Sequence, residues 1–126
     1  MERESVKKLK NWILSLKNFL NSAENTAVVV EGKRDLAALE RFGVYPVFAL
    51  KGMGFHSFSE MLADEKGIRL VILITDFDPE GEEIARKLQR VLSKYNIKVD
   101  TSFRESLRET GLKFVEEIPE KLRMAF

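Results

Sequence analysis

The chain contains no cysteine and a single histidine, His56, among its 126 residues. The lack of cysteine excludes disulfides, zinc–thiolate sites and cysteine nucleophiles, and one histidine cannot form a multi-histidine metal site. Long apolar runs are also missing, since no segment approaches the roughly 20 residues that a membrane span requires. The charged N-terminal region lacks the apolar segment of a signal peptide. We therefore expect a cytoplasmic protein that does not enter a membrane.

An excess of either charge is absent too, because 21 Lys and Arg residues stand against 20 Asp and Glu residues and give a net charge of +1. This balance excludes a basic coat over the whole molecule, but it allows a local basic patch around an acidic site. Hydrophobic residues make up 44% of the 126 residues, which is enough for a core of ordinary size. We expect residues 1–126 to form one domain.

The hydrophobic pattern changes repeatedly between helical and strand character. Residues 4–21 carry apolar side chains at helical spacing, which is typical of an amphipathic helix. Apolar runs predict strands at residues 26–31, 46–50, 69–75 and 97–99, with helices at 34–42, 55–63, 80–95 and 102–110. From residue 112 onward the pattern fits a strand or a helix. Strands that alternate with helices predict a compact, Rossmann-like α/β domain with a four-stranded, mostly parallel sheet flanked by helices.

Carboxylates follow two of the predicted strands. The apolar run 70–74 is followed by Asp76 and Asp78, and the run 27–30 by Glu31. Right-handed crossovers place the carboxyl ends of parallel strands along one edge of the sheet, where open α/β sheets bind ligands. Carboxylate oxygens suit Mg²⁺, and one or two such ions could neutralise and orient a phosphodiester. Glu31 could complete this metal site or act as a general acid or base, and Mn²⁺ could replace Mg²⁺.

A purely structural role is the alternative for the aspartate pair. Asp is common in turns, and acidic residues suit the N-terminus of a helix such as the one predicted at 80–95. Capping does not readily explain a third acid, Glu31, at the end of a second strand. The combination therefore favours a functional site.

Two segments together resemble the Toprim domain, which type IA and type II topoisomerases, bacterial primases, some nucleases and recombination-associated proteins share. These are Val-Val-Glu-Gly at residues 29–32 and Thr-Asp-Phe-Asp-Pro-Glu-Gly-Glu at residues 75–82. The second is similar to a run in type IA topoisomerases, and the resemblance covers about residues 26–99. It implies a four-stranded parallel sheet, with Mg²⁺ held by Asp76 and Asp78 with help from Glu31. It also implies that Glu31 is the general acid or base.

Basic and glycine residues near the predicted edge are candidates for phosphate binding. Lys33 and Asp35 match a form of the first motif found in small Toprim proteins and ribosomal RNA maturation nucleases. Gly52 falls where the family often has a glycine after its second strand. We expect Lys33, Lys51 and Gly52 to contact phosphate groups through side chains or backbone amides.

The resemblance and the residues leave several functions open. Type IA and type II topoisomerases and primases need further domains, and Tyr45 and Tyr95 are better interpreted as packing residues than as nucleophiles. We expect a Mg²⁺-dependent nuclease or primase-like protein that acts on DNA or RNA. The sequence is compatible with a protein partner or a homodimer and does not decide between them. The alternative is a non-catalytic nucleic-acid-binding or scaffold module. A haloacid dehalogenase-type phosphatase, with Asp100 as a further acid, and a phospho-receiver domain, with Lys113 as its lysine, fit the spacing less well.

Overall fold

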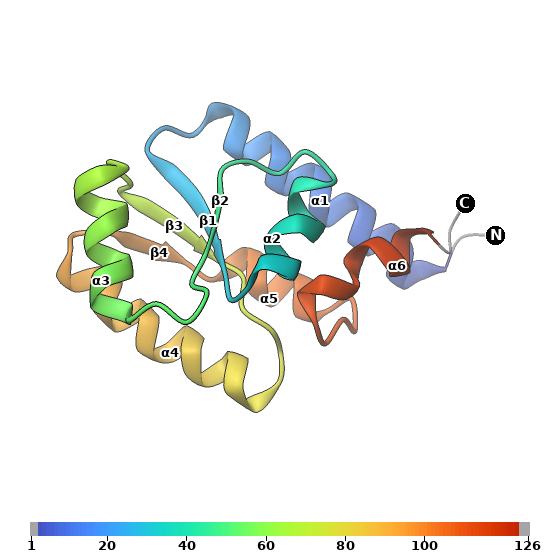
Figure 1. Ribbon diagram of the computed structural model, residues 1–126. Helices are drawn as coiled ribbons and strands as arrows, with labels where there is room; N and C mark the ends of the chain where they lie inside the picture. Colours follow the sequence, from blue (N-terminus) through green and yellow to red (C-terminus); the bar gives the residue numbers. More distant parts are fainter. Residues whose placement is uncertain (1–2, 124–126) are drawn as a thin grey trace.

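Four parallel strands form the centre of the molecule. The computed structural model describes residues 3–123, and its strands are β1 (Thr26–Val30), β2 (Val47–Ala49), β3 (Leu70–Leu73) and β4 (Lys98–Asp100). They lie in the order β2-β1-β3-β4, and every neighbouring pair is parallel (Figure 1). The α/β fold with a four-stranded parallel sheet, expected from the sequence, is confirmed.

Helices connect the strands and cover the sheet. Within residues 3–123 they are α1 (Glu4–Ser22), α2 (Lys33–Glu40), α3 (Phe55–Glu60), α4 (Pro79–Lys94), α5 (Ser102–Arg108) and α6 (Ile118–Arg123). A π-helical turn, η1 (Met61–Glu65), continues α3, and a 3-10 turn, η2 (Val115–Glu117), leads into α6. The C-terminal part that the sequence left undecided is therefore helical. Within the same described range, no helix combines the length and the apolarity needed to cross a bilayer.

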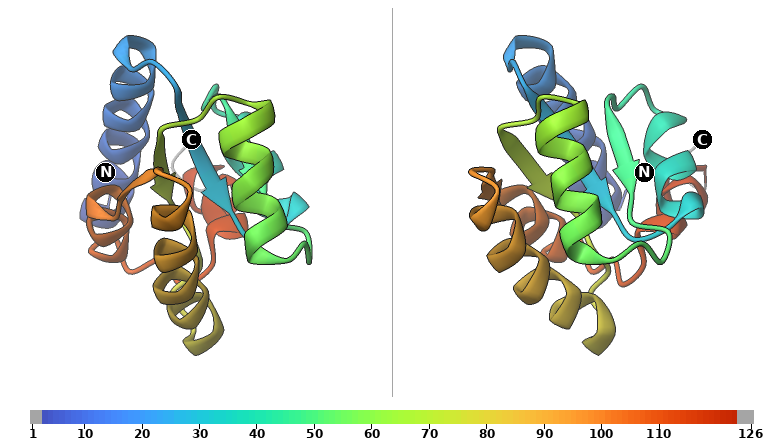
Figure 2. Two further views of the ribbon diagram at one scale, coloured as in Figure 1. Left: turned by 90° about the vertical axis from the view of Figure 1, so that its left-hand side faces the viewer. Right: turned by 60° about the vertical axis from the view of Figure 1, so that its left-hand side comes forward.

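Two hydrophobic cores lie on opposite faces of the sheet. Alternate side chains of β1 enter each core, so that Val28 and Val30 face one and Ala27 and Val29 face the other. The first core also takes buried residues from α1, α2, α5 and α6, and the second takes them from α3, η1 and α4. Figure 2 shows α1 and α3 on opposite sides of the strands. Burial on both faces explains why residues 27–30 of β1 and all of β3 are apolar.

Helix α1 is part of the first core. Trp12 donates a hydrogen bond from Nε1 to the carbonyl oxygen of Phe103 over 2.7 Å. The rings of Phe19 and Phe103 lie 5.7 Å apart between centroids. The N-terminal helix therefore covers the sheet together with α5.

The carboxyl ends of the two central strands and of β2 meet at one edge. Leu73 pairs with Val29, and the backbone N–H of Ile74 donates to the carbonyl oxygen of Val29 over 2.9 Å. On the other side of β1, the N–H of Lys51 donates to the carbonyl oxygen of Glu31 over 3.0 Å. The segments that follow β1, β2 and β3 consequently leave the sheet side by side.

Candidate functional site

Glu31 and Asp76 meet directly at this edge. The backbone N–H of Asp76 donates a hydrogen bond to Glu31 Oε2 over 2.7 Å, although 45 residues separate the two in the chain. Glu31 follows the last residue of β1, and Asp76 follows the apolar end of β3. The two acids that the sequence assigned to neighbouring strand ends are therefore in contact.

Asp78 lies at the start of α4 and caps it. Its Oδ1 accepts a hydrogen bond from the N–H of Gly81 over 2.8 Å, and Pro79 occupies the first turn, where its missing N–H costs nothing. The capping role considered as an alternative is real for Asp78. It engages one carboxylate oxygen, and a carboxylate offers two.

Gly81 lets the end of β3 pack against the first turn of α4. A Cβ atom at this position would lie 2.1 Å from the carbonyl oxygen of Asp76 and 2.9 Å from Asp78 Oδ1. Thr75 ties the same two segments together, since its buried Oγ1 donates to the carbonyl oxygen of Gly81 over 2.8 Å. A side chain at position 81 would therefore push both aspartates away from their present positions.

The C-terminal segment also reaches the site, which the sequence did not indicate. The N–H of Val115 donates to Asp76 Oδ1 over 2.7 Å, and the N–H of Phe77 donates to the carbonyl oxygen of Lys113 over 2.9 Å. These bonds tie Asp76 and Phe77 to the C-terminal segment. Backbone donors and acceptors leave no trace in the residue types, so no sequence signal could have revealed them.

Burial and mutual repulsion raise the pKa values of the clustered acids. Burial raises the pKa of Glu31 to about 7, the hydrogen bond from the Asp76 N–H opposes this, and the charges of Asp76, Asp35 and Asp78 add to it. Burial likewise raises the pKa of Asp76, against the hydrogen bond from Val115, and the charge of Asp78 adds to the increase. The negative charges of the cluster are therefore not balanced by nearby positive charges, and a bound cation would balance them.

Asp35 is a further member of this cluster. Its side chain is buried, and its Oδ2 accepts a hydrogen bond from the N–H of Gly32 over 3.1 Å, which caps α2. Burial raises the pKa of Asp35 to about 6, and the negative charges of Asp76 and Glu116 contribute. The sequence marked Asp35 only as part of the first motif. Its place in the first turn of the helix that follows Glu31 could have suggested that the two residues lie close together.

The chemistry of this donor set fits Mg²⁺. Glu31, Asp76 and Asp78 supply carboxylate oxygens, which are the protein ligands Mg²⁺ prefers. Each of the three uses one oxygen to accept a backbone N–H. Within residues 3–123, however, no group of three or more His, Asp or Glu side chains is arranged so that it could hold a metal ion. These carboxylates would have to turn towards one another to enclose an ion.

The residues expected to contact phosphate lie close to the cluster along the backbone. Lys33 is exposed at the first position of α2, two residues after Glu31. Lys51 and Gly52 are exposed in the turn after β2, both with positive φ, of 53° and 78°. The backbone bond from Lys51 to Glu31 holds this turn beside the first carboxylate.

Two alternative functions depended on residues that have structural partners. Asp100 accepts hydrogen bonds from Ser102 Oγ over 2.7 Å and from the N–H of Phe103 over 3.2 Å, so it caps α5. Lys113 contributes its carbonyl oxygen to Phe77, and its Nζ lies 5.5 Å from the ring centroid of Phe114. Neither contact is one that a phosphatase or a phospho-receiver domain would require of these side chains.

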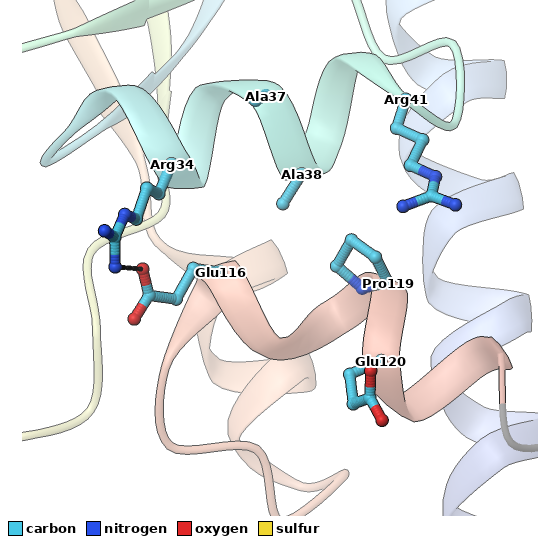
Figure 3. Close-up of a pocket in the computed structure, with 7 residues that line it drawn as sticks. All are labelled: Arg34, Ala37, Ala38, Arg41, Glu116, Pro119 and Glu120. Carbon is cyan, nitrogen blue, oxygen red and sulfur yellow. Dashed lines mark ion pairs between the residues drawn. The ribbon is translucent and has the colours of Figure 1, made fainter.

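A groove of about 410 Å³ runs between α2 and the C-terminal segment (Figure 3). It is lined on one side by Arg34, Ala37 and Ala38 of α2 and by Arg41, which follows that helix, and on the facing side by Glu116, Pro119 and Glu120. Arg34 and Glu116 form an ion pair across it, with 4.0 Å between Nη1 and Oε2. The groove therefore separates the helix that carries Asp35 from the segment that binds Asp76, and this ion pair bridges the two.

Comparisons with known proteins agree with this geometry. A family model described as "Toprim domain" matches residues 26–104. A UPF0292 protein of Thermococcus onnurineus is 34% identical over 119 residues, which cover 94% of this chain and 84% of the relative. A UPF0292 protein of Pyrococcus horikoshii is 37% identical over 93 residues, covering 73% and 68%. A solved structure described as a putative protein from Aquifex aeolicus has a TM-score of 0.76 and 33% identity, covering 86% of this chain and 96% of that one.

Proposed function

Because this chain belongs to the Toprim domain family, whose model matches residues 26–104, we propose that it performs Mg²⁺-dependent chemistry on the phosphodiester bonds of DNA or RNA. The reaction is that of a small nuclease or of a primase-like nucleotidyl transferase. The observation that carries the proposal is the hydrogen bond of 2.7 Å that brings Asp76 against Glu31. It joins acids from the two central strands into one cluster.

In this proposal Asp76 and Asp78 bind the metal, with Glu31 beside them. When bound, one or two Mg²⁺ ions would neutralise the phosphodiester charge and orient its oxygens, and Mn²⁺ would substitute. The backbone bonds at Asp76 and Asp78 restrict where each carboxylate can turn. Burial and the negative charge of Asp78 now raise the pKa of Asp76, and the positive charge of the ion would oppose both effects.

Glu31 is the proposed general acid or base. In the metal-free protein burial raises the pKa of Glu31 to about 7, so that its protonated and ionised forms are both present near neutral pH. Oε2 accepts the Asp76 N–H, which leaves Oε1 as the atom that would carry the proton. An ordinary exposed glutamate would be fully ionised under the same conditions and could not act as an acid.

Lys33, Lys51 and the backbone of Gly52 are the proposed phosphate contacts. All three positions are exposed and flank Glu31 along α2 and the turn after β2. Cations there would offset the negative field of the carboxylate cluster for an approaching nucleic acid. Binding through such contacts should weaken as salt increases, because counterions compete for the phosphates.

A cleavage assay tests the proposed function. Labelled single-stranded and structured RNA and DNA would be incubated with Mg²⁺, Mn²⁺ or EDTA. Wild type would be compared with Glu31→Gln and with the double variant Asp76→Asn, Asp78→Asn. Glu60→Gln is the matched control, because Glu60 is an exposed acid at the end of α3.

We expect metal-dependent products from wild type and from Glu60→Gln. In both site variants we expect the cleavage rate to fall by about 100-fold or more. Products that persist in the site variants would contradict the assignment of Glu31, Asp76 and Asp78. Metal-dependent nucleic-acid binding without any product would favour the alternative, a non-catalytic module that works with a partner.

A further inference from the structure

Arg104 is a buried arginine whose guanidinium reaches the loop that carries the two aspartates. Its side chain is only 5% exposed. Nε donates to the carbonyl oxygen of Thr75 over 3.0 Å, and Nη2 donates to the carbonyl oxygen of Asp76 over 2.5 Å. A buried charge is costly unless it is paired and hydrogen-bonded, so these contacts are the reason that the fold tolerates it.

The other side of this guanidinium is anchored to α4. Nη2 of Arg104 also forms an ion pair with Glu82. The Cζ atom of Arg104 lies 4.7 Å from the ring centroid of Phe77, which is the residue between the two aspartates. One side chain therefore holds the end of β3, the residue at the tip of the turn and the first turns of α4 together.

Arg108 shares two of these partners but not the backbone. Its Nη2 lies 2.9 Å from Glu82 Oε2, and its Cζ lies 5.0 Å from the Phe77 ring centroid. Its side chain is 41% exposed, against 5% for Arg104. Arg104 and Arg108 therefore carry the same charge and both contact Glu82 and Phe77, but Arg104 is the one that donates to Thr75 and Asp76.

We propose that Arg104 is a positioning residue that fixes the aspartate loop, residues 75–78, in the arrangement that presents Asp76 and Asp78 to a metal ion. Arg104 binds the backbone carbonyl groups of Thr75 and Asp76 and does not occupy the carboxylate oxygens of Asp76 and Asp78. The part of this inference that concerns metal binding rests on the proposed function. Its structural part, the fixing of the loop, stands on the contacts of Arg104 alone.

The chemistry of arginine explains why this residue type is needed. Its planar fork carries donors on several edges, so it can bind two successive carbonyl groups and a carboxylate at the same time. A lysine has the same charge at a single point and could not span all three acceptors. Arg104→Lys should therefore restore the charge without restoring the loop.

The test compares Arg104→Met, Arg104→Lys and Arg108→Met with wild type. Methionine keeps an unbranched apolar stem but has no donor, and Arg108→Met is the matched control. The first measurement is amide hydrogen exchange in metal-free protein, read by NMR. The reporters are the N–H of Asp76, bonded to Glu31, and the N–H of Phe77, bonded to Lys113. Amides inside β3 are the internal reference.

The second measurement is the dissociation constant of Mn²⁺, taken by calorimetry on the same proteins. We expect faster exchange at Asp76 and Phe77 in both Arg104 variants, with unchanged exchange inside β3. We also expect Mn²⁺ affinity to fall by about 10- to 100-fold, as for other supports of metal ligands. Arg108→Met should stay close to wild type in both measurements.

Unchanged exchange at Asp76 and Phe77 in Arg104→Met would overturn the inference, whatever happens to activity. Equally accelerated exchange throughout β3 would overturn it as well, because Arg104 would then support the whole fold and not the loop. Failure of the wild-type protein to bind Mn²⁺ would instead refute the proposed function. The exchange rates would still decide whether Arg104 fixes the loop.

Discussion

A single hydrogen atom at Gly81 separates helix α4 from the backbone of Asp76. A Cβ there would lie 2.6 Å from the carbonyl carbon of Asp76, which is backbone and cannot rotate away. We expect Gly81→Ala to destabilise the protein by at least about 2 kcal/mol, because the loop and the helix must separate. Urea denaturation would measure this change, and Mn²⁺ affinity should fall with it.

Gly54→Ala is the control for this substitution. Gly54 lies directly before α3, whereas Gly81 lies in the first turn of α4. Gly54 has a φ of −62° and open space where a Cβ would be added. We expect Gly54→Ala to lower the free energy of unfolding by no more than about 1 kcal/mol, the usual cost of alanine at a helix N-cap. Equal losses at positions 54 and 81 would show that the close approach at Gly81 does not matter.

The raised pKa values of single acids predict how stability depends on pH. The pKa of Glu31 rises from 4.5 to about 7 and that of Asp35 from 3.8 to about 6, so the folded protein holds protons that the unfolded chain has already lost. Stability of the metal-free protein should therefore fall as pH rises from about 4.5 to about 7. Glu82 has the opposite effect: burial raises its pKa, but hydrogen bonds from Arg104 and Arg108 outweigh burial and lower it. Its contribution is lost only as pH falls below about 4.5.

Urea midpoints measured in EDTA at pH 5, 6, 7 and 8 would check this prediction. Glu31→Gln cannot ionise, so its stability should decline less over the same range. A wild-type midpoint that stays level or increases from pH 5 to pH 7 would contradict the assigned direction.

At the scale of single elements, the sequence predicted the central strands well and the C-terminal segment poorly. β1 and β3 are buried on both faces, and such burial requires the continuous apolar runs that identified them. Residues 115–123 form short helical turns that bury only a few apolar residues each, and Pro119 lies inside the last one. Their conformation depends on contacts with α1, α2 and the aspartate loop, which local patterns do not encode.

The same limit applies to the candidate site. Glu31, Asp76 and Asp78 could be predicted because strand ends and topology bring them together. Arg104 and Val115 could not, because they reach Asp76 from 28 and 39 residues away and through backbone groups. A buried arginine has no sequence pattern that separates it from an exposed one, such as Arg108.

Val115→Pro would test the contribution of the C-terminal segment to the site. Proline removes the N–H that binds Asp76, and the backbone accepts it: Val115 begins the 3-10 turn, and Phe114 before it is extended, with φ −121° and ψ 129°. We expect the free energy of unfolding to fall by about 1 kcal/mol or more, because a half-buried carboxylate loses its donor. The pKa of Asp76 should rise further, since this bond now lowers it.

Val115→Ala is the matched control, because it keeps the N–H and removes only methyl groups. A carboxyl ¹³C titration of both variants would measure the pKa of Asp76. The same pKa in the proline and the alanine variants would mean that the bond from Val115 does not influence the carboxylate.

At the scale of the whole molecule, metal binding should couple to folding. An ion that binds only the folded carboxylate cluster stabilises the protein by about 2.7 kcal/mol at a concentration 100 times its dissociation constant. We therefore expect Mg²⁺ and Mn²⁺ to raise the melting temperature of wild type. The variant Asp76→Asn, Asp78→Asn should melt at the same temperature with and without metal in differential scanning calorimetry. A similar increase in both proteins would place the bound ion elsewhere.

Segments of the chain outside the family match contribute to the hydrophobic core. The match ends at residue 104, whereas α1 and the segment from residue 112 to α6 contribute to the first core. The first of these lies against α5, and the second contacts Asp76. The Toprim core and these additions therefore form one packed structure around the aspartate loop.

The hydrogen bond from Val115 to Asp76 has a consequence for the order in which the protein is made. A ribosome adds about 5–20 residues per second, so the 39 residues between these partners correspond to a delay of about 2–8 s. During that interval the nascent chain gains Asp78 and then, 28 residues after Asp76, Arg104, but it does not yet contain Val115. The acidic loop is therefore synthesised first, and the C-terminal segment that binds Asp76 is synthesised last.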